Sequence, residues 1–238
     1  MVSQVRFECG TPLHVGESRS YVGIEAIVER QTLRAFVVTV EHDESAEAAD
    51  IVQRARQVLR DVEILVAIGA GAEPGSHSPT LNGAEWKESL FGSMAEWDSH
   101  PIRFLEHMPA ADLVVRLRDD ATLKRQAEFL IDSRRASHWA TRISLSYQIL
   151  ELEQQRGNGY RSPDWCRHLR NSVSHPLLND PEVREYLERS LGAASVDFDD
   201  PIHRKFLRDE CLKLRKQAAD VIDSHLLDSK FWAVAGST

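Results

Sequence analysis

The hydrophobic and polar positions change their spacing along the first part of the chain. Between residues 21 and 40, β-branched and aromatic residues predominate and a polar stretch at 29–32 interrupts them. This pattern predicts two strands joined by a short turn. Residues 2–7 (VSQVRF) favour a third strand. From 51 to 65 the apolar residues recur every three or four positions behind a Ser45 N-cap, which predicts an amphipathic helix.

The glycine-rich segment 69–83 is the most loop-like part of the chain. Gly69 and Gly71 have the spacing of a dinucleotide-binding loop, but Pro74 stands where the third glycine belongs. The apolar residues before Gly69 also continue the helical pattern, whereas that loop requires a strand there. We therefore expect the glycines to end a helix.

Two further apolar patterns follow before residue 118. A row of apolar and aromatic residues at helical spacing predicts a packed helix over residues 86–97. The run LVVRL at 113–117 is short and apolar, and we expect it to form a strand that closes the N-terminal sheet.

After Asp119 the pattern is helical almost to the end of the chain. Apolar spacing predicts helices over 123–130 and over 139–156, the second stopped by Gly157 and Gly159. Three Ser-Pro or Asp-Pro pairs predict further helix starts at residues 162, 180 and 200. The sequence thus predicts an α+β fold: a small β-sheet with helices over residues 1–118, of unassigned role, then an all-α helical bundle over 119–238.

Composition and charge narrow the classes of function. The 238 residues are 42% hydrophobic and carry a formal net charge of −8, which argues against a protein that neutralises the phosphates of duplex DNA. The 3 cysteines have no paired spacing, so no disulfide framework or zinc ribbon is expected. With no apolar leader and no run of bilayer-spanning length, we expect a cytoplasmic protein with no membrane partner.

One segment is basic although the chain as a whole carries a net negative charge. Residues 134–175 contain seven arginines and only three acidic residues. The arginines are Arg134, Arg135, Arg142, Arg156, Arg161, Arg167 and Arg170. Because the planar guanidinium group donates forked hydrogen bonds, it suits contacts with phosphate.

The stretch HLRNSVSHP (168–176) lies within this basic segment. His175 precedes Pro176, which disfavours helical backbone, so His175 is expected at or just beyond a helix end. Arg170 would lie about one and a half turns earlier, with its Cα roughly 7 to 9 Å from that of His175. The two side chains can converge on a ligand. The alternative is a helix C-terminus whose cations complement the helix dipole.

The string Arg170-Asn171-Ser172-Val173-Ser174-His175 resembles the R-x4-H signature of the HEPN superfamily (higher eukaryotes and prokaryotes nucleotide-binding domain), in its R-N-x-x-x-H form. The likeness covers about the last 120 residues, an ordinary domain size. It extends to the context: a long helix before the motif, the motif near a helix end, and a closing amphipathic helix.

This resemblance implies a metal-independent endoribonuclease that needs no cofactor and acts as a homodimer, with both motifs facing one cleft. His175 would serve as general base or acid for attack of the ribose 2′-hydroxyl on the adjacent phosphate, and Arg170 would stabilise the phosphoryl oxygens. Asn171 would orient the site. The products would be a 2′,3′-cyclic phosphate and a 5′-hydroxyl.

Other residues and partners follow from the same resemblance. Arg167, His168 and Arg161 are the candidates for further contact with RNA. Many relatives are toxins or act in defence against phage, which implies an antitoxin or other regulatory partner. Some toxin members carry a tyrosine two residues after the histidine, where this chain has Leu177. A catalytically inactive HEPN domain that binds a nucleotide or RNA, or that only dimerises, is therefore the alternative function.

Two other patterns that contain histidine predict neither a metal site nor a catalytic residue. Cys166, His168 and His175 do not have the spacing of a metal site and no second cluster completes four ligands, so no metal is expected. His225 lies on the apolar face of the last predicted helix, and we expect it to be a buried, partner-bonded residue or an interface residue rather than a catalyst.

Overall fold

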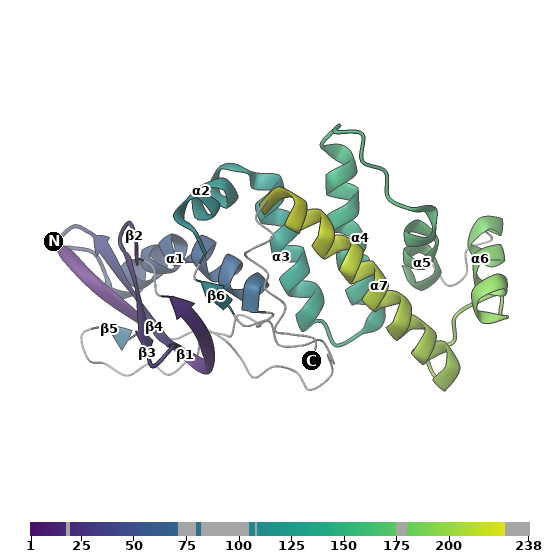
Figure 1. Cartoon of the computed structure of the whole chain (residues 1–238), viewed down its shortest axis with the longest axis horizontal. Coiled ribbons are helices and arrows are strands. Elements are labelled where there is room, and N and C mark those ends of the chain that lie inside the picture. The colour runs from purple at the N-terminus through teal and green to yellow at the C-terminus, as the bar shows by residue number, and fades with distance from the viewer. Residues whose placement is uncertain (18–19, 71–79, 82–104, 108, 175–179, 227–238) are drawn as a thin grey trace. The chain divides into compact units, whose positions relative to one another are not determined.

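A computed structural model describes residues 1–17, 20–70, 80–81, 105–107, 109–174 and 180–226. The chain divides into two compact units, Met1–Asp120 and Ala121–Leu227 (Figure 1). In the parts of the two units that are described, the first holds a β-sheet and two helices, and the second holds five helices. The fold class is therefore α+β, with the strands in the N-terminal unit.

The sheet of the first unit is built around strand β1. Its strands are β1 (Val2–Glu17), β2 (Ser20–Tyr21), β3 (Ile24–Glu29), β4 (Thr32–Glu41), β5 (Thr80–Leu81) and β6 (Leu105–His107). They lie in the order β2-β3-β4-β1-β5, all antiparallel, and β6 pairs with β1 in parallel. The strand expected at 2–7 is confirmed and runs ten residues further, with a register shift between Glu8 and Leu13.

The hairpin between β3 and β4 turns at Arg30 and Gln31, within the predicted polar stretch. Both residues have left-handed backbone, with φ of 48° and 61°. A two-residue hairpin turn with positive φ at both positions has the twist of type I′, which asparagine and glycine adopt more easily. The sequence predicted the turn but not its left-handed conformation, because Arg and Gln give no such signal.

Helix α1 (Ala48–Ala70) packs against β1 and β4. Along β1 the alternate residues Val5 and Phe7 are buried, as a one-sided sheet requires, while β4 also buries the adjacent pair Ala35 and Phe36. The predicted cap at Ser45 is wrong: α1 begins three residues later, and the Glu47 carbonyl accepts the first hydrogen bonds, from Asp50 and Ile51. The segment before Gly69 is helical, as expected, so no strand leads into a dinucleotide-binding loop.

The strand predicted at 113–117 is wrong, because these residues lie in helix α2 (Ala111–Asp119). Leu113, Val114 and Leu117 are buried and Val115 is 50% exposed, which is a one-faced helical pattern and not an alternating one. Arg118 Nε lies 3.3 Å from Asp61 Oδ2 of α1, in an ion pair that ties the two helices together. A five-residue apolar run is too short to reveal its period.

The helix predicted over 86–97 and most of the predicted loop at 69–83 lie outside the described residues. Of that loop segment, residues 69–70 are described as the end of α1, and Thr80 and Leu81 form β5.

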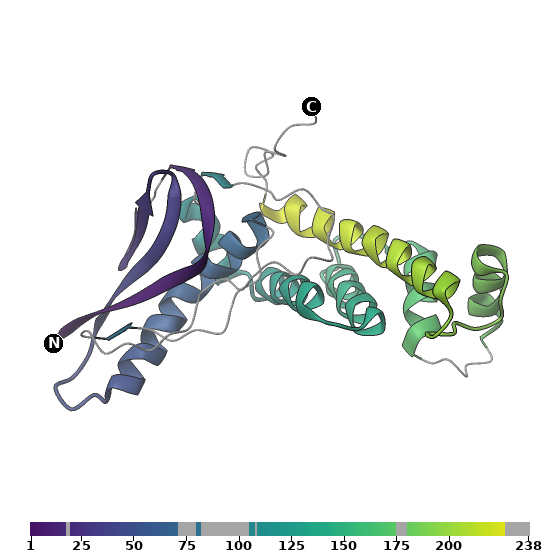
Figure 2. The ribbon, with the colours of Figure 1, turned by 90° about the horizontal axis from the view of Figure 1, so that it is seen from below.

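The second unit contains α3 (Ala121–Arg135), α4 (Trp139–Gln155), α5 (Asp164–Ser174), α6 (Pro181–Leu191) and α7 (Pro201–Leu226). Helices α3, α4 and α7 pack against one another, while α5 packs on α4 and α6 on α5 (Figure 2). The unit is thus a helical bundle in which α5, the helix that carries Arg170, is held between α4 and α6.

The Asp-Pro pairs start α6 and α7 as predicted, whereas Ser162 does not cap α5: this helix begins at Asp164, and the Pro163 carbonyl accepts from the Cys166 N–H. Asp180 Oδ1 accepts from the backbone N–H groups of Glu182 and Val183, and Asp200 caps α7 in the same way. Gly192 ends α6 with φ of 73°, and Gly157 follows α4 with φ of 72°. The buried stripe of α7 is Leu207, Cys211, Leu214, Ala218 and Ile222, each 0% exposed.

Candidate functional site

Helix α5 presents its polar residues beside the face that it buries. The buried residues are Cys166, Leu169, Ser172 and Val173. Arg167, Arg170 and Ser174 follow one another at spacings of three and four, so they share one face of the helix. Packing of the buried face fixes the direction of this polar row.

Arg170 is half-buried and is held by two neighbours. Its Nη1 donates a 3.0 Å hydrogen bond to Oδ1 of Asn171. Its Cζ lies 6.0 Å from the ring centroid of Tyr147 in α4, at the outer limit of a cation–π contact. Further along the same two helices, the Oγ atoms of Ser144 and Ser174 lie 3.4 Å apart. These contacts give the junction of α4 and α5 a polar character.

The pKa of the Tyr147 hydroxyl is affected by groups at this junction of α4 and α5. Burial raises the pKa of its hydroxyl, and Glu151 acts in the same direction. A hydrogen bond with Ser162 and the positive charges of Arg170 and Arg167 act in the opposite direction. Two arginines of α5 therefore place positive charge near the same tyrosine of α4.

No carboxylate in the described part of the chain forms an ion pair with Arg170. Its guanidinium group bonds to a neutral amide and lies beside an aromatic ring. Helix α5 ends at Ser174, one residue before His175. His175 itself lies outside the described residues, as does Leu177.

Arg167 and His168 are brought together with a residue that the sequence analysis did not single out, Glu182 at the start of α6. Arg167 Nη2 donates to Glu182 Oε2 at 2.6 Å, and His168 Nε2 lies 3.4 Å from the same oxygen. The Arg167 hydrogen bond, followed by that of His168, lowers the pKa of the Glu182 carboxyl group. The His168 ring lies 5.8 Å from that of Tyr186, which is buried.

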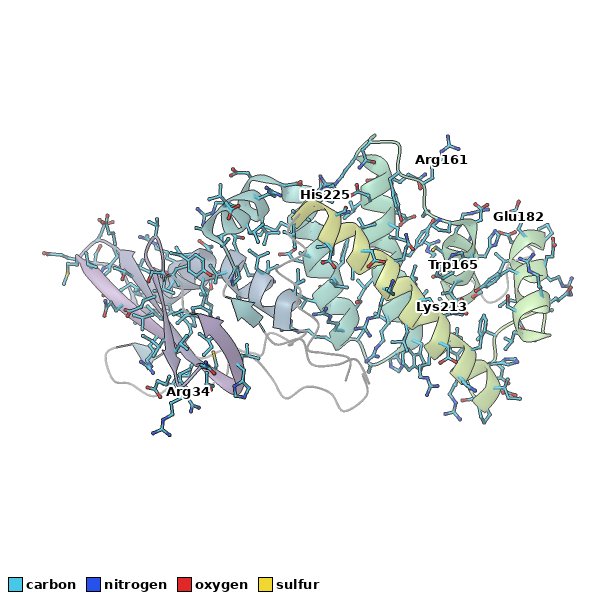
Figure 3. All side chains as sticks on the ribbon, viewed as in Figure 1. Arg34, Arg161, Trp165, Glu182, Lys213 and His225 are labelled. Atoms are coloured by element: carbon cyan, nitrogen blue, oxygen red, sulfur yellow. The ribbon has the colours of Figure 1, made fainter. Side chains whose placement is uncertain are left out.

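Arg161, the third predicted RNA contact, is exposed on the segment between α4 and α5, and its side chain projects away from the helices (Figure 3). Two other arginines of the basic segment have structural partners. Arg142 is buried and donates from Nε to the carbonyl of Ala136 at 2.5 Å. Arg156 Nε lies 3.0 Å from Glu153 Oε2. Arg161, Arg167 and Arg170 are the arginines of the basic segment that lie on α5 or on the segment leading into it.

A buried polar network lies elsewhere in the bundle and was also missed. The Glu153 side chain is 4% exposed, and its Oε2 accepts from Gln126 Nε2 at 3.0 Å and pairs with His225 Nε2 at 2.8 Å. Asn158 donates to Oε1. His225 thus has a bonded partner, as expected, but its own side chain is 26% exposed and not buried. Neither Glu153 nor Glu182 gave a sequence signal, because their partners lie on other helices.

Within the described ranges, no group of three or more histidine, cysteine, aspartate or glutamate side chains is arranged to hold a metal ion. Cys166 is buried, and desolvation raises the pKa of its thiol to about 12, which disfavours the thiolate form that binds metals. None of the helices in the described residues is both long and apolar enough to span a bilayer.

The comparisons with known proteins add no relative to this picture. No protein-family model, curated protein or solved structure matches the chain.

Proposed function

We propose that the protein is a metal-independent endoribonuclease of the HEPN type, with Arg170 and His175 as its catalytic pair. The observation that carries the proposal is the state of Arg170 near the end of α5: it is oriented by Asn171, lies beside Tyr147, and has no carboxylate partner among the described residues. In the same unit Arg156 is paired with an acid, Glu153, whereas the Arg170 guanidinium bonds to the amide of Asn171.

The proposed cleavage of RNA uses only side chains of the protein and the 2′-hydroxyl of the RNA. The His175 imidazole takes the proton of a ribose 2′-hydroxyl, and the oxygen attacks the adjacent phosphorus. The bond from phosphorus to the 5′-oxygen breaks, and that oxygen takes a proton from a second acid, which is His175 of a second copy in a homodimer. The products are a 2′,3′-cyclic phosphate and a 5′-hydroxyl. Arg170 stabilises the negative charge that builds on the phosphoryl oxygens.

The test is cleavage of a mixed-sequence RNA by the purified full-length chain in EDTA. We expect the unaltered protein to cut, and His175→Ala and Arg170→Ala to lose at least a hundredfold in rate. His138→Ala and Arg184→Ala are the matched controls, since both residues are exposed in the same unit and Arg184 pairs with Glu188 of its own helix. They should cut like the unaltered chain.

Two results would overturn the proposal. His175→Ala that cuts as fast as His138→Ala would remove the histidine from the mechanism. An unaltered chain that binds RNA without turnover would assign the site to a binding module, the inactive form of a HEPN domain.

A further inference from the structure

Arg167, His168 and Glu182 form a three-membered contact between α5 and α6. All three pairwise distances are short: 2.6 Å from Arg167 Nη2 to Glu182 Oε2, 3.4 Å from His168 Nε2 to the same oxygen, and 3.2 Å between the two nitrogens. The two basic side chains thus converge on one carboxylate oxygen. Figure 3 shows Glu182 near the start of α6.

We propose that Glu182 occupies a phosphate-binding position formed by Arg167 and His168, and that a backbone phosphate of RNA displaces it. The inference rests on the proposed function in one respect, that the ligand is RNA. It adds a second point of contact to the Arg170 site, and it makes Glu182 an internal competitor that limits the affinity for RNA.

The chemistry of the two anions supports the exchange. A carboxylate and a phosphodiester each carry one negative charge and offer oxygens to the same nitrogen donors. Arg167 keeps its remaining guanidinium N–H groups for a larger anion. The His168 side chain is only 13% exposed and lies beside the Tyr186 ring, so its nitrogen is already in place when the carboxylate leaves.

Displacing Glu182 from Arg167 costs little free energy, because both side chains are exposed. The side chains of Arg167 and Glu182 are 44% and 61% exposed, and exposed ion pairs change an equilibrium by only about 1.5-fold to fivefold. Asp164 and Asp180 also act on Arg167 through their charges, so the site is weakened by more than one acid. Glu182 is the one of these three whose carboxylate bonds directly to Arg167.

The experiment measures binding of a fluorescently labelled 2′-O-methyl oligonucleotide, which has no free 2′-hydroxyl and cannot be cut by this mechanism. Glu182→Gln and Glu185→Gln each remove one negative charge from α6, and Glu185 is exposed without a contact to Arg167. We expect Glu182→Gln to bind about two- to fivefold more tightly than Glu185→Gln. Arg167→Ala should bind more weakly than the unaltered chain, and Glu182→Gln should have a smaller effect in the Arg167→Ala background than alone, since only His168 then remains beside Glu182.

Equal affinities of Glu182→Gln and Glu185→Gln would overturn the inference, as would Arg167→Ala that binds as tightly as the unaltered chain. Thermal unfolding of each variant shows whether the fold is kept, since Glu182 also lies in the first turn of α6. Because the oligonucleotide cannot be cut, this outcome is separate from that of the nuclease assay. A chain that fails to cleave RNA can still show the Glu182 effect, and a chain that cleaves can lack it.

Discussion

The imidazole of His225 and the carboxylate of Glu153 lie 2.8 Å apart although 72 residues separate them in the chain. The contact fastens the end of α7 to the last turns of α4, and Gln126 of α3 bonds to the same carboxylate. Three helices of the second unit therefore meet at one buried acid. This network stabilises the bundle that holds α5.

Glu153 gives the chain an acid-sensitive contribution to stability. Burial acts to raise the pKa of its carboxyl group, but hydrogen bonds from Gln126, His225 and Asn158 outweigh burial and the pKa is lowered. A lowered folded-state pKa adds stability above the unfolded value, near 4.5, and this stability is lost as pH falls through the folded-state pKa. Glu153→Gln should therefore unfold more easily than the unaltered chain at pH 7, by about 1 to 3 kcal/mol.

Urea unfolding at a series of pH values tests this. The difference in unfolding free energy between the unaltered chain and Glu153→Gln should shrink as pH falls below the unfolded pKa. Glu151→Gln, two residues away on α4, is the control and should show a smaller loss. A difference that stays constant from neutral to strongly acidic pH would contradict the assignment.

Residues better suited to the left-handed turn than Arg30 and Gln31 should make the first unit more stable. Left-handed backbone costs an ordinary residue about 1 to 2 kcal/mol, whereas Asn-Gly adopts the type I′ turn readily. Replacing the pair by Asn-Gly should raise the stability of the first unit by about 1 kcal/mol in thermal or urea unfolding. Gln31→Ala keeps the left-handed position without glycine and should give no gain. A loss of stability with Asn-Gly would refute the turn geometry.

The contribution of the Asp180 cap to stability should also be measurable. Its side chain accepts two backbone hydrogen bonds at the start of α6, and losing such a cap costs about 1 kcal/mol. Asp180→Ala should therefore lower the urea midpoint, while Asp180→Asn, which keeps an acceptor oxygen, should lower it less. Equal midpoints for the two variants would mean that the cap contributes nothing.

Local signals and long-range packing explain which parts of the fold could be predicted. The helix starts at Pro181 and Pro201 followed from adjacent Asp-Pro pairs, since capping depends on neighbouring residues. The run at 113–117 was assigned wrongly because burial against α1, not local preference, decides its conformation. Propensity is routinely overridden in this way.

In the candidate site, too, features set by local sequence could be predicted and features set by helix packing could not. The position of Arg170 near a helix end could be predicted, because it depends on Pro176 and on periodicity. The contact of Arg167 with Glu182 could not, because it depends on how α6 packs on α5. The role of Arg170 and His175 stays a prediction that only chemistry on RNA can test.

Asn171 should act as a positioning residue for Arg170. Removing the Oδ1 acceptor in Asn171→Ala frees the guanidinium group to rotate, which should lower kcat on RNA roughly tenfold with little change in KM, since about 1.4 kcal/mol of orientation is lost. Lys216→Ala, whose side chain is 80% exposed on α7 and outside the proposed site, should keep the unaltered kcat. If Asn171→Ala changed KM alone, Asn171 would contribute to binding and not to the orientation of Arg170.

The most direct test of the central claim is the identity of the ends that the protein leaves on RNA. Mass spectrometry of a short RNA cut in EDTA should find 2′,3′-cyclic phosphate and 5′-hydroxyl ends, and a single 2′-deoxy substitution should protect the linkage that follows it. Ends with a 5′-phosphate and a 3′-hydroxyl, or cleavage at the 2′-deoxy position, would contradict an attack by the ribose hydroxyl.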